Sequence, residues 1–200
     1  MSVATSTDRL TAEDFFRWVS LPENRDLHAE LEQGEVIEMP PPGKYHGFVC
    51  GNVAGILRDY AIKQGRGYVC TNDAGLIVER DPDTVRGPDV TFYDDNQTAE
   101  TMERQFAQRP PLLAVEIISP NDRLNRTVLR ISQMLRLGVP MVWIVDPETR
   151  DVSVYRVGQD PRLVQADETL GGEDVLLEFR CRVSAFFDLP GQKTSPLGEA

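Results

Sequence analysis

The sequence has no apolar stretch that could cross a membrane and no cysteine spacing that would build a zinc site or a disulfide framework. Its longest apolar runs, such as LLAV and MVWIV, fall far short of the ~18 residues of a membrane span. Cys50, Cys70 and Cys181 are scattered and odd in number. The first ten residues lack the apolar core of a signal peptide. We therefore expect a cytoplasmic protein with reduced cysteines and no membrane partner.

Positive charge is also scarce. The chain has 21 Lys and Arg residues against 32 Asp and Glu residues, which gives a net charge of −11. The field of such a chain repels phosphates at long range, so any contact with nucleic acid needs a local basic patch or bound cations. With 200 residues, 40% of them hydrophobic and 26% charged, the chain otherwise has the composition of a soluble globular protein.

Hydrophobic periodicity and turn residues divide the chain into helices and strands without a repeat or a domain linker. Helices are predicted from Thr11 onward and over residues 46–64, 121–137 and 184–187. Strands are predicted within 29–39 and over 68–79, 89–93, 112–118, 141–145 and 152–157, with candidates near 163 and 175–177 and a turn at 81–87. This order predicts a single α+β, or mixed α/β, domain over residues 11–189, between loose ends at 1–10 and 190–200.

Two acidic residues occupy unusual positions. Glu116 interrupts the apolar run LLAVEII, where a lone buried carboxylate is costly without a partner or a metal. Asp89 opens the strand PDVTFY. If the two strands pair antiparallel with Tyr93 opposite Leu112, Asp89 falls opposite Glu116, and opposed side chains lie within about 5.5 Å of each other.

Two carboxylates at that distance repel each other unless a cation lies between them. Hard oxygen ligands on one face suit magnesium or manganese. Each acid also has a structural alternative: Asp89 as a turn residue after a proline, and Glu116 as a hydrogen-bond partner of a neighbouring loop. The pair alone names no reaction.

Longer segments around these acids resemble a known family. RGPDVTF, then about twenty residues, LLAVEIISPND, and a helix ending in LGVPMVWIVDP resemble the Uma-two family of restriction endonucleases, in the PD-(D/E)XK nuclease superfamily. The upstream segment AELEQGEVIEMPPPGKYHG is similar to the opening of that family. The resemblance covers about residues 11–157. It implies a restriction endonuclease-like core, a central mixed β-sheet flanked by helices.

The resemblance assigns roles to individual residues. Asp89 and Glu116 match the family's metal-binding acids, and Glu30 matches an upstream acid that would be a further ligand of the metal or its water. For Glu30 the alternative is a solvated strand residue. His46 opens a helix beside the site, where a packing or helix-end role competes with a phosphate contact. His28 belongs to no motif and is expected on the surface.

One position departs from the superfamily. A Lys usually stands two residues after the second acid, where this chain has Ile118. In the family the basic role is moved to the following helix, and this chain has Arg130 where Lys is usual. Arginine is a poor general base, but it can clamp a phosphate or stabilise developing negative charge.

The helix at 121–137 therefore carries two predicted faces. Arg123, Arg126 and Arg130 share one sector of it, either toward the acids or as a solvated basic face. The opposite, buried stripe is predicted to be Leu124, Val128, Ile131 and Leu135.

Three functions remain open. The first is a metal-dependent endonuclease that hydrolyses phosphodiester bonds, with magnesium or manganese as cofactor, DNA as the expected partner, Asp89, Glu116 and Arg130 as catalytic residues, and a homodimer left open. The second is a non-catalytic interaction or regulatory module on the same fold, which the missing Lys and the net charge favour. The third is a metal-dependent hydrolase of a small phosphorylated substrate, which would reconcile an acidic surface with a metal site.

Overall fold

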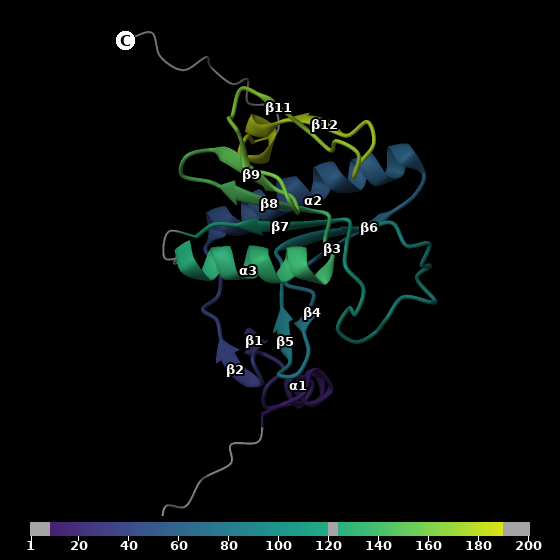
Figure 1. Ribbon diagram of the computed structural model, residues 1–200, viewed down its shortest axis with the longest axis vertical. Helices are drawn as coiled ribbons and strands as arrows, with labels where there is room; N and C mark the ends of the chain where they lie inside the picture. The colour runs from purple at the N-terminus through teal and green to yellow at the C-terminus, as the bar shows by residue number, and fades with distance from the viewer. Residues whose placement is uncertain (1–8, 120–123, 190–200) are drawn as a thin grey trace, which may run out of the picture.

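The computed structural model describes residues 9–119 and 124–189. Outside this part of the chain lie residues 1–8 of the expected loose end at 1–10, the expected loose end at 190–200, and residues 121–123 of the helix predicted from 121, with Arg123 among them. The described residues form an α+β fold in which helices flank a central mixed sheet, as predicted (Figure 1). None of the described helices has the length and apolar character to span a membrane.

The central sheet has six strands in the order β10-β9-β8-β7-β6-β3. Their bounds are β3 Tyr68–Thr71, β6 Val90–Tyr93, β7 Leu113–Ile117, β8 Met141–Asp146, β9 Asp151–Tyr155 and β10 Arg162–Val164. Strands β7 and β8 run parallel and are connected by helix α3 (Leu124–Leu137), while the other neighbours pair antiparallel. A crossover helix is the usual connection between parallel strands, because a tight turn can join only antiparallel ones.

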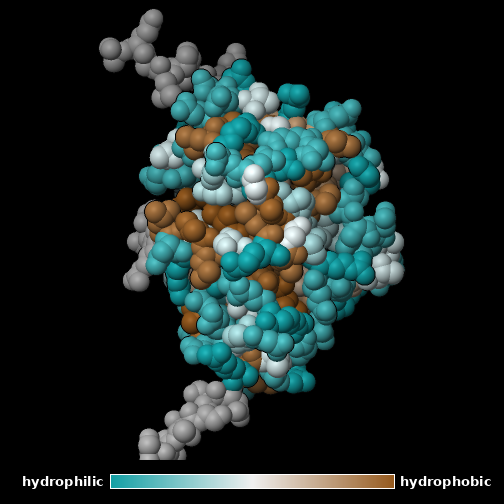
Figure 2. Space-filling view, in the orientation of Figure 1, coloured by the Kyte–Doolittle hydropathy of each residue, from teal (hydrophilic) through white to brown (hydrophobic). Residues whose placement is uncertain are grey.

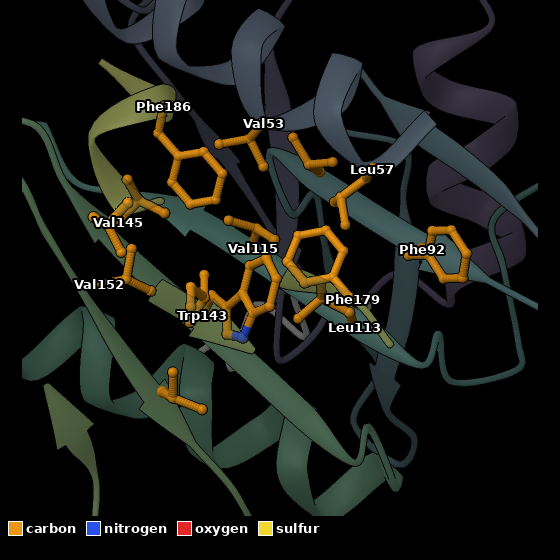
Figure 3. Packing of buried hydrophobic residues seen from close by; sticks show 14 of the residues in the cluster. Val53, Leu57, Phe92, Leu113, Val115, Trp143, Val145, Val152, Phe179 and Phe186 are labelled. Atoms are coloured by element: carbon orange, nitrogen blue, oxygen red, sulfur yellow. The ribbon is translucent and has the colours of Figure 1, made fainter. Parts of the chain in front are cut away.

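Helices α2 (Lys44–Gln64) and α3 cover opposite faces of this sheet (Figure 1). Side chains alternate between the faces along a strand. Leu113, Val115 and Ile117 of β7 therefore pack with α2, whereas Ala114 packs with α3. Trp143 of β8 lies at the centre of the α2 side, among apolar side chains of the sheet, of α2 and of the C-terminal segment (Figure 3).

A second, four-stranded sheet lies at the end of the molecule that carries α1 (Figure 1). Its order is β2-β1-β5-β4, with bounds β1 Ala29–Glu32, β2 Glu35–Glu38, β4 Leu76–Glu79 and β5 Thr84–Arg86. Helix α1 (Ala12–Val19) begins at Thr11, as predicted, because Thr11 and Asp14 form a reciprocal capping box. Phe15 then packs with Leu31 and Val85.

Two strand predictions in this region are wrong. The single strand predicted over 68–79 is two strands, β3 and β4, in different sheets, because the chain turns at Asn72 and Asp73, which both have positive φ. The segment 81–87, predicted as a turn, contains β5, which pairs with both β1 and β4.

The predicted apolar stripe of α3 is also wrong in part. Leu124 and Val128 are 80% and 53% exposed, while Ile131 and Met134 are buried. The helix is rotated relative to the prediction because Arg130 turns inward to Glu116, and Gln133 turns inward to Arg86 and Glu79. Apolar side chains gather across the middle of the face shown in Figure 2.

The C-terminal segment forms a two-stranded sheet of β11 (Thr169–Gly171) and β12 (Arg180–Arg182), followed by the 3-10 helix η1 (Val183–Phe186). The short helix predicted at 184–187 is confirmed, and so is a strand near residue 163. No strand forms at 175–177. Phe179 and Phe186 close the α2 side of the core around Trp143.

Candidate active site at the junction of the two sheets

The pairing of β6 with β7 follows the predicted register. Val90 lies opposite Val115, and Phe92 lies opposite Leu113. The same offset aligns Asp89, the residue before β6, with Glu116 in β7. The register that was assumed from the equal spacing of the two acids is therefore the observed one.

Glu116 points away from α2, on the face of β7 that α3 covers. Both oxygens of its carboxylate accept hydrogen bonds from Arg130: 3.1 Å from Nε to Oε1 and 3.1 Å from Nη2 to Oε2, with Nη2 also 2.8 Å from Oε1. Arginine presents its donors in a rigid fork that matches a carboxylate, which makes this the strong, two-pronged form of ion pair. The prediction that Arg130 points toward the acids is confirmed.

The same guanidinium reaches Glu30 in the four-stranded sheet. Its Nη1 lies 2.6 Å from Oε1 and 2.7 Å from Oε2 of Glu30, and its Nη2 donates to the carbonyl of Gly87 at 3.1 Å. Arg130 therefore ties β7 of one sheet to β1 of the other. Glu30 is buried, so its alternative as a solvated strand residue is excluded.

Gly87 is the backbone link between these groups. Its N–H donates to Glu30 Oε1 at 2.8 Å, while its carbonyl accepts from Arg130. A Cβ at this position would lie 2.7 Å from both Cβ and the carbonyl oxygen of Asp73. The close approach of the two backbones therefore requires glycine here.

Asp89 is held differently from the other two acids. Its Oδ2 accepts the N–H of Ile117 at 2.6 Å, and its Oδ1 lies 3.3 Å from His46 Nε2. His46 also lies 3.1 Å from the Ile117 carbonyl and 3.4 Å, through Nδ1, from Cys50 Sγ. A packing or helix-end role and a phosphate contact were both left open for His46, and the structure places its ring against Asp89. A single histidine at a helix start carries no sequence signal for that contact.

Burial and shared charge set the protonation of the acids. Burial raises the pKa of Glu116 to about 8 although Arg130 lowers it, and the negative charges of Asp89 and Glu30 add to the rise. Burial also opposes ionisation of Glu30, but Arg130, the Gly87 amide and Arg86 together lower its pKa. Burial and the neighbouring acids therefore favour the neutral form of Glu116, whereas the positive charges around Glu30 favour its ionised form.

The protonation of His46 follows from its partners. Its hydrogen bond to Asp89, helped by Cys50, raises the pKa of His46 to about 11 against the effect of burial. The ring is therefore an imidazolium at neutral pH and adds a second positive charge beside the acids.

A buried arginine supports the site from behind and was missed in the sequence. Arg86 Nη1 donates to Glu30 at 3.1 Å and to Glu32 at 2.9 Å, and its Nε donates to Gln133 at 2.9 Å. Arg86 ends β5, in the segment predicted as a turn, so no pattern indicated that it would be buried. Arg126 of α3 remains exposed, 3.9 Å from Glu32.

An open cavity of about 400 Å³ adjoins Glu30, Arg86 and Gly87. Its lining includes His28 and Asp73, whose side chains lie 3.0 Å apart. Burial raises the pKa of Asp73, and the negative charge of Asp89 adds to the rise, so Asp73 belongs to the same electrostatic neighbourhood. His28, expected on the surface, is half-buried here.

The carboxylates of the site are compatible with a magnesium-like ion that takes only part of its ligands from the protein. Magnesium is usually bound through one or two carboxylates, waters and substrate phosphates rather than a full protein cage. Asp89 and Glu116 would supply those carboxylates, while Arg130 lies between Glu116 and Glu30. Within the described residues, three metal-ligating side chains come within 4.8 Å of one another only at His46, Cys50 and Asp89.

Comparison with known proteins agrees with the fold. A family model described as "Uma2: Putative restriction endonuclease" matches residues 12–184. A solved structure described as "a putative nuclease belonging to DUF820", from Anabaena variabilis, superimposes with a TM-score of 0.74 at 19% sequence identity. The alignment covers 89% of this chain and 97% of that one. No curated protein matches.

Proposed function

The chain belongs to the Uma2 family of restriction endonuclease-like proteins, and from this premise we propose that it is a metal-dependent endonuclease that hydrolyses phosphodiester bonds in DNA. One observation carries the proposal: the guanidinium of Arg130, which is mostly shielded from solvent, lies between two acids from different sheets, Glu30 and Glu116. A third acid, Asp89, directly precedes β6 and binds the backbone at the end of β7. Buried charges in such number are costly unless they are paired and are typical of functional sites.

Asp89 and Glu116 are the proposed ligands of magnesium or manganese, and Glu30 is a further ligand of the ion or of its water. When bound, such an ion polarises a phosphoryl oxygen and lowers the pKa of a coordinated water. Glu116 must give up its proton to coordinate, and its raised pKa makes the apo site reluctant to ionise without a cation.

Arg130 replaces the missing lysine as the source of positive charge. Ile118, at the position where lysine is usual, packs against the apolar cluster on the α3 side and donates its N–H to Val145. Arg130 comes from the neighbouring helix to the same acids. It remains protonated throughout, so its role is to hold a phosphate and stabilise charge that develops in the transition state, not to remove a proton from water.

Local positive features offset the acidic surface near the site. Helix α2 begins at Lys44, has no side-chain cap at Gly43, and brings the imidazolium of His46 to Asp89. The free N–H groups at the start of a helix attract anions. With Arg126 exposed on α3, these groups give a phosphate backbone a place to bind in spite of the net charge of −11.

The test is cleavage of plasmid, linear and single-stranded DNA, and of RNA, in millimolar magnesium or manganese. We expect cleavage of DNA by the unmodified protein and none by Glu116→Ala. Glu100→Ala, which removes an exposed acid from the loop between β6 and β7, is the matched control and should cleave normally. Melting temperature should also rise with either metal, and Asp89→Asn should abolish the rise. No cleavage and no melting shift would refute the proposal.

A second function is favoured by the pairing of Arg130 itself. Arg130 satisfies Glu30 and Glu116 without any metal, which would also suit a non-catalytic interaction module on this fold. That module should melt at the same temperature with and without metal, so the melting experiment separates the two. The homodimer left open above can be measured by sedimentation velocity; exposed Leu124 and Val128 on α3 offer an apolar surface for it.

A further inference from the structure

Three side chains of different chemistry converge on one side of the candidate active site. His46 and Cys50 come from the first turns of α2, and Asp89 comes from the start of β6. Cys50 Sγ lies 3.4 Å from His46 Nδ1, and Asp89 Oδ1 lies 3.3 Å from His46 Nε2. A ligand atom of each lies within 4.8 Å of the others.

We propose that His46, Cys50 and Asp89 form a binding site for a thiophilic divalent cation of the zinc class, separate in chemistry from the magnesium site. Magnesium takes oxygen ligands and avoids sulfur, whereas zinc combines thiolate, imidazole and carboxylate in one coordination shell. With zinc bonds of ~2.0–2.3 Å, neighbouring ligand atoms in a tetrahedron lie ~3.3–3.8 Å apart. The Cys50 Sγ–His46 Nδ1 contact of 3.4 Å is of that size. Asp89 approaches the same ring from the Nε2 side, and a ligand atom of each of the three residues lies within 4.8 Å of the others.

Helix α2 places His46 and Cys50 close enough together to bind one ion. Residues four apart in an α-helix project from the same face, one turn above the other. His46 and Cys50 have this spacing in α2, and the face that carries them points toward the end of β7, where Asp89 lies.

The hydrogen bonds that orient such ligands are already present. A metal-binding histidine usually donates its other ring N–H to a carbonyl or carboxylate, which fixes the nitrogen that binds the metal. Here His46 Nε2 faces the Ile117 carbonyl at 3.1 Å, which leaves Nδ1, the nitrogen beside Cys50, as the ligand. The Ile117 N–H likewise occupies Asp89 Oδ2. Oδ1, which lies 3.3 Å from His46 Nε2, is the Asp89 oxygen that would exchange this contact for the metal.

Three protein ligands leave the fourth position of a tetrahedral ion open to water or to a phosphate oxygen. Asp89 is shared with the proposed magnesium site. A zinc ion at His46, Cys50 and Asp89 therefore competes with magnesium for that carboxylate. It follows, if the proposed nuclease function holds, that micromolar zinc inhibits cleavage in magnesium.

The test uses cobalt(II) alone as a probe, because a cobalt–thiolate bond gives a strong near-ultraviolet charge-transfer band that oxygen and nitrogen ligands do not give. The unmodified protein should develop this band, and added zinc should remove it. Cys50→Ser should not develop it. Cys70→Ser is the matched control, since Cys70 is also free and half-buried but lies in β3, and it should keep the band.

Zinc affinity gives the second measurement, by competition with a chromophoric chelator. Cys50→Ser should weaken binding by about tenfold or more, because loss of even an outer-shell partner costs about 10–100-fold, and Cys70→Ser should leave it unchanged. A band retained in Cys50→Ser, or no band in the folded unmodified protein, overturns the proposal. Neither readout needs cleavage. An inactive protein with the Cys50-dependent band refutes only the nuclease, and an active protein without the band refutes only the zinc site.

Discussion

The two faces of β7 are built on opposite principles. Toward α2, Leu113, Val115 and Ile117 enter a dry apolar layer around Trp143. Toward α3, the same strand presents Glu116 to a guanidinium and, through it, to Glu30. One face lowers the free energy of the fold by removing apolar surface from water; the other keeps charges in a poorly solvated place and must pair each of them.

The apolar face of β7 therefore stabilises the fold, whereas the charged face carries the groups that can take part in a reaction. The apolar face loses stability when a large buried side chain is removed, but it has no reactive group. The charged face contributes little net stability, because the attraction between buried ions is offset by the cost of removing them from water. Changes on the first face should appear in the free energy of unfolding, and changes on the second in rates and in pH dependence.

The largest expected effect is on the apolar face. Trp143→Ala should lower the free energy of unfolding by about 3–5 kcal/mol, because it removes a fully buried aromatic side chain and leaves a cavity. Urea denaturation measures it. Trp143→Phe is the control: the indole Nε1 has no hydrogen-bond partner among the described residues, so phenylalanine removes an unsatisfied polar atom and should cost much less. Equal losses in the two variants would contradict this account.

The next effect is on the charged face. Arg130→Ala should slow single-turnover cleavage in manganese by about 10²-fold or more, as loss of one charge-stabilising donor typically does. Arg130→Lys, which restores the family's usual residue, should keep or raise the rate. An alanine variant as fast as the unmodified protein would remove Arg130 from the mechanism.

A third prediction uses pH. Between the ordinary glutamate pKa of 4.5 and the folded value of about 8, native Glu116 holds a proton that the unfolded chain has released. The free energy of unfolding therefore contains a contribution that is present at low pH and is lost as pH rises through about 8. Each unit of pKa difference is worth about 1.4 kcal/mol.

The measurement compares the unmodified protein with Glu116→Gln, which cannot titrate, in urea at several pH values. Between pH 5 and pH 8.5 the unmodified protein should lose free energy of unfolding relative to Glu116→Gln. Above that range the difference between the two proteins should stay constant. Parallel curves over this range would show that Arg130 keeps Glu116 ionised.

The smallest expected effect on stability concerns an exposed apolar side chain of α3, which is compared with a buried one in the same helix. Leu124→Ala should change stability by no more than about 0.5 kcal/mol, because the side chain is 80% exposed. Ile131→Ala, in the same helix but buried, should cost about 2–5 kcal/mol. A large loss of unfolding free energy in Leu124→Ala would mean that the exposed apolar side chains of α3 are covered in solution.

Local signals in the sequence predicted those parts of the fold that local forces determine. The capping box at Thr11 marks the start of α1, and the matched spacing around Asp89 and Glu116 gives the β6–β7 register. The α3 stripe was misjudged because periodicity counts apolar residues only. It does not reveal that polar partners, Glu116 for Arg130 and Glu79 for Gln133, would draw these side chains inward.

Sheet membership was harder to predict. Nothing in residues 68–79 shows that their two halves join different sheets, since that depends on partners far along the chain. Arg86 and His46 acquire their roles from the same distant contacts. The family resemblance led to Glu30, Asp89, Glu116 and Arg130, whereas composition and periodicity alone would have led only to Asp89 and Glu116.

The bond between Glu30 and Arg130 joins residues 100 positions apart in the chain. During synthesis, the strand with Glu30 leaves the ribosome well before the helix with Arg130 exists, and a closure of this length forms slowly compared with local structure. Until α3 is made and docked, the acids have neither their guanidinium nor their neighbours from the other sheet. Any chemistry of this site therefore requires a chain that extends through α3, and a product that ends before this helix lacks the guanidinium that joins the two sheets.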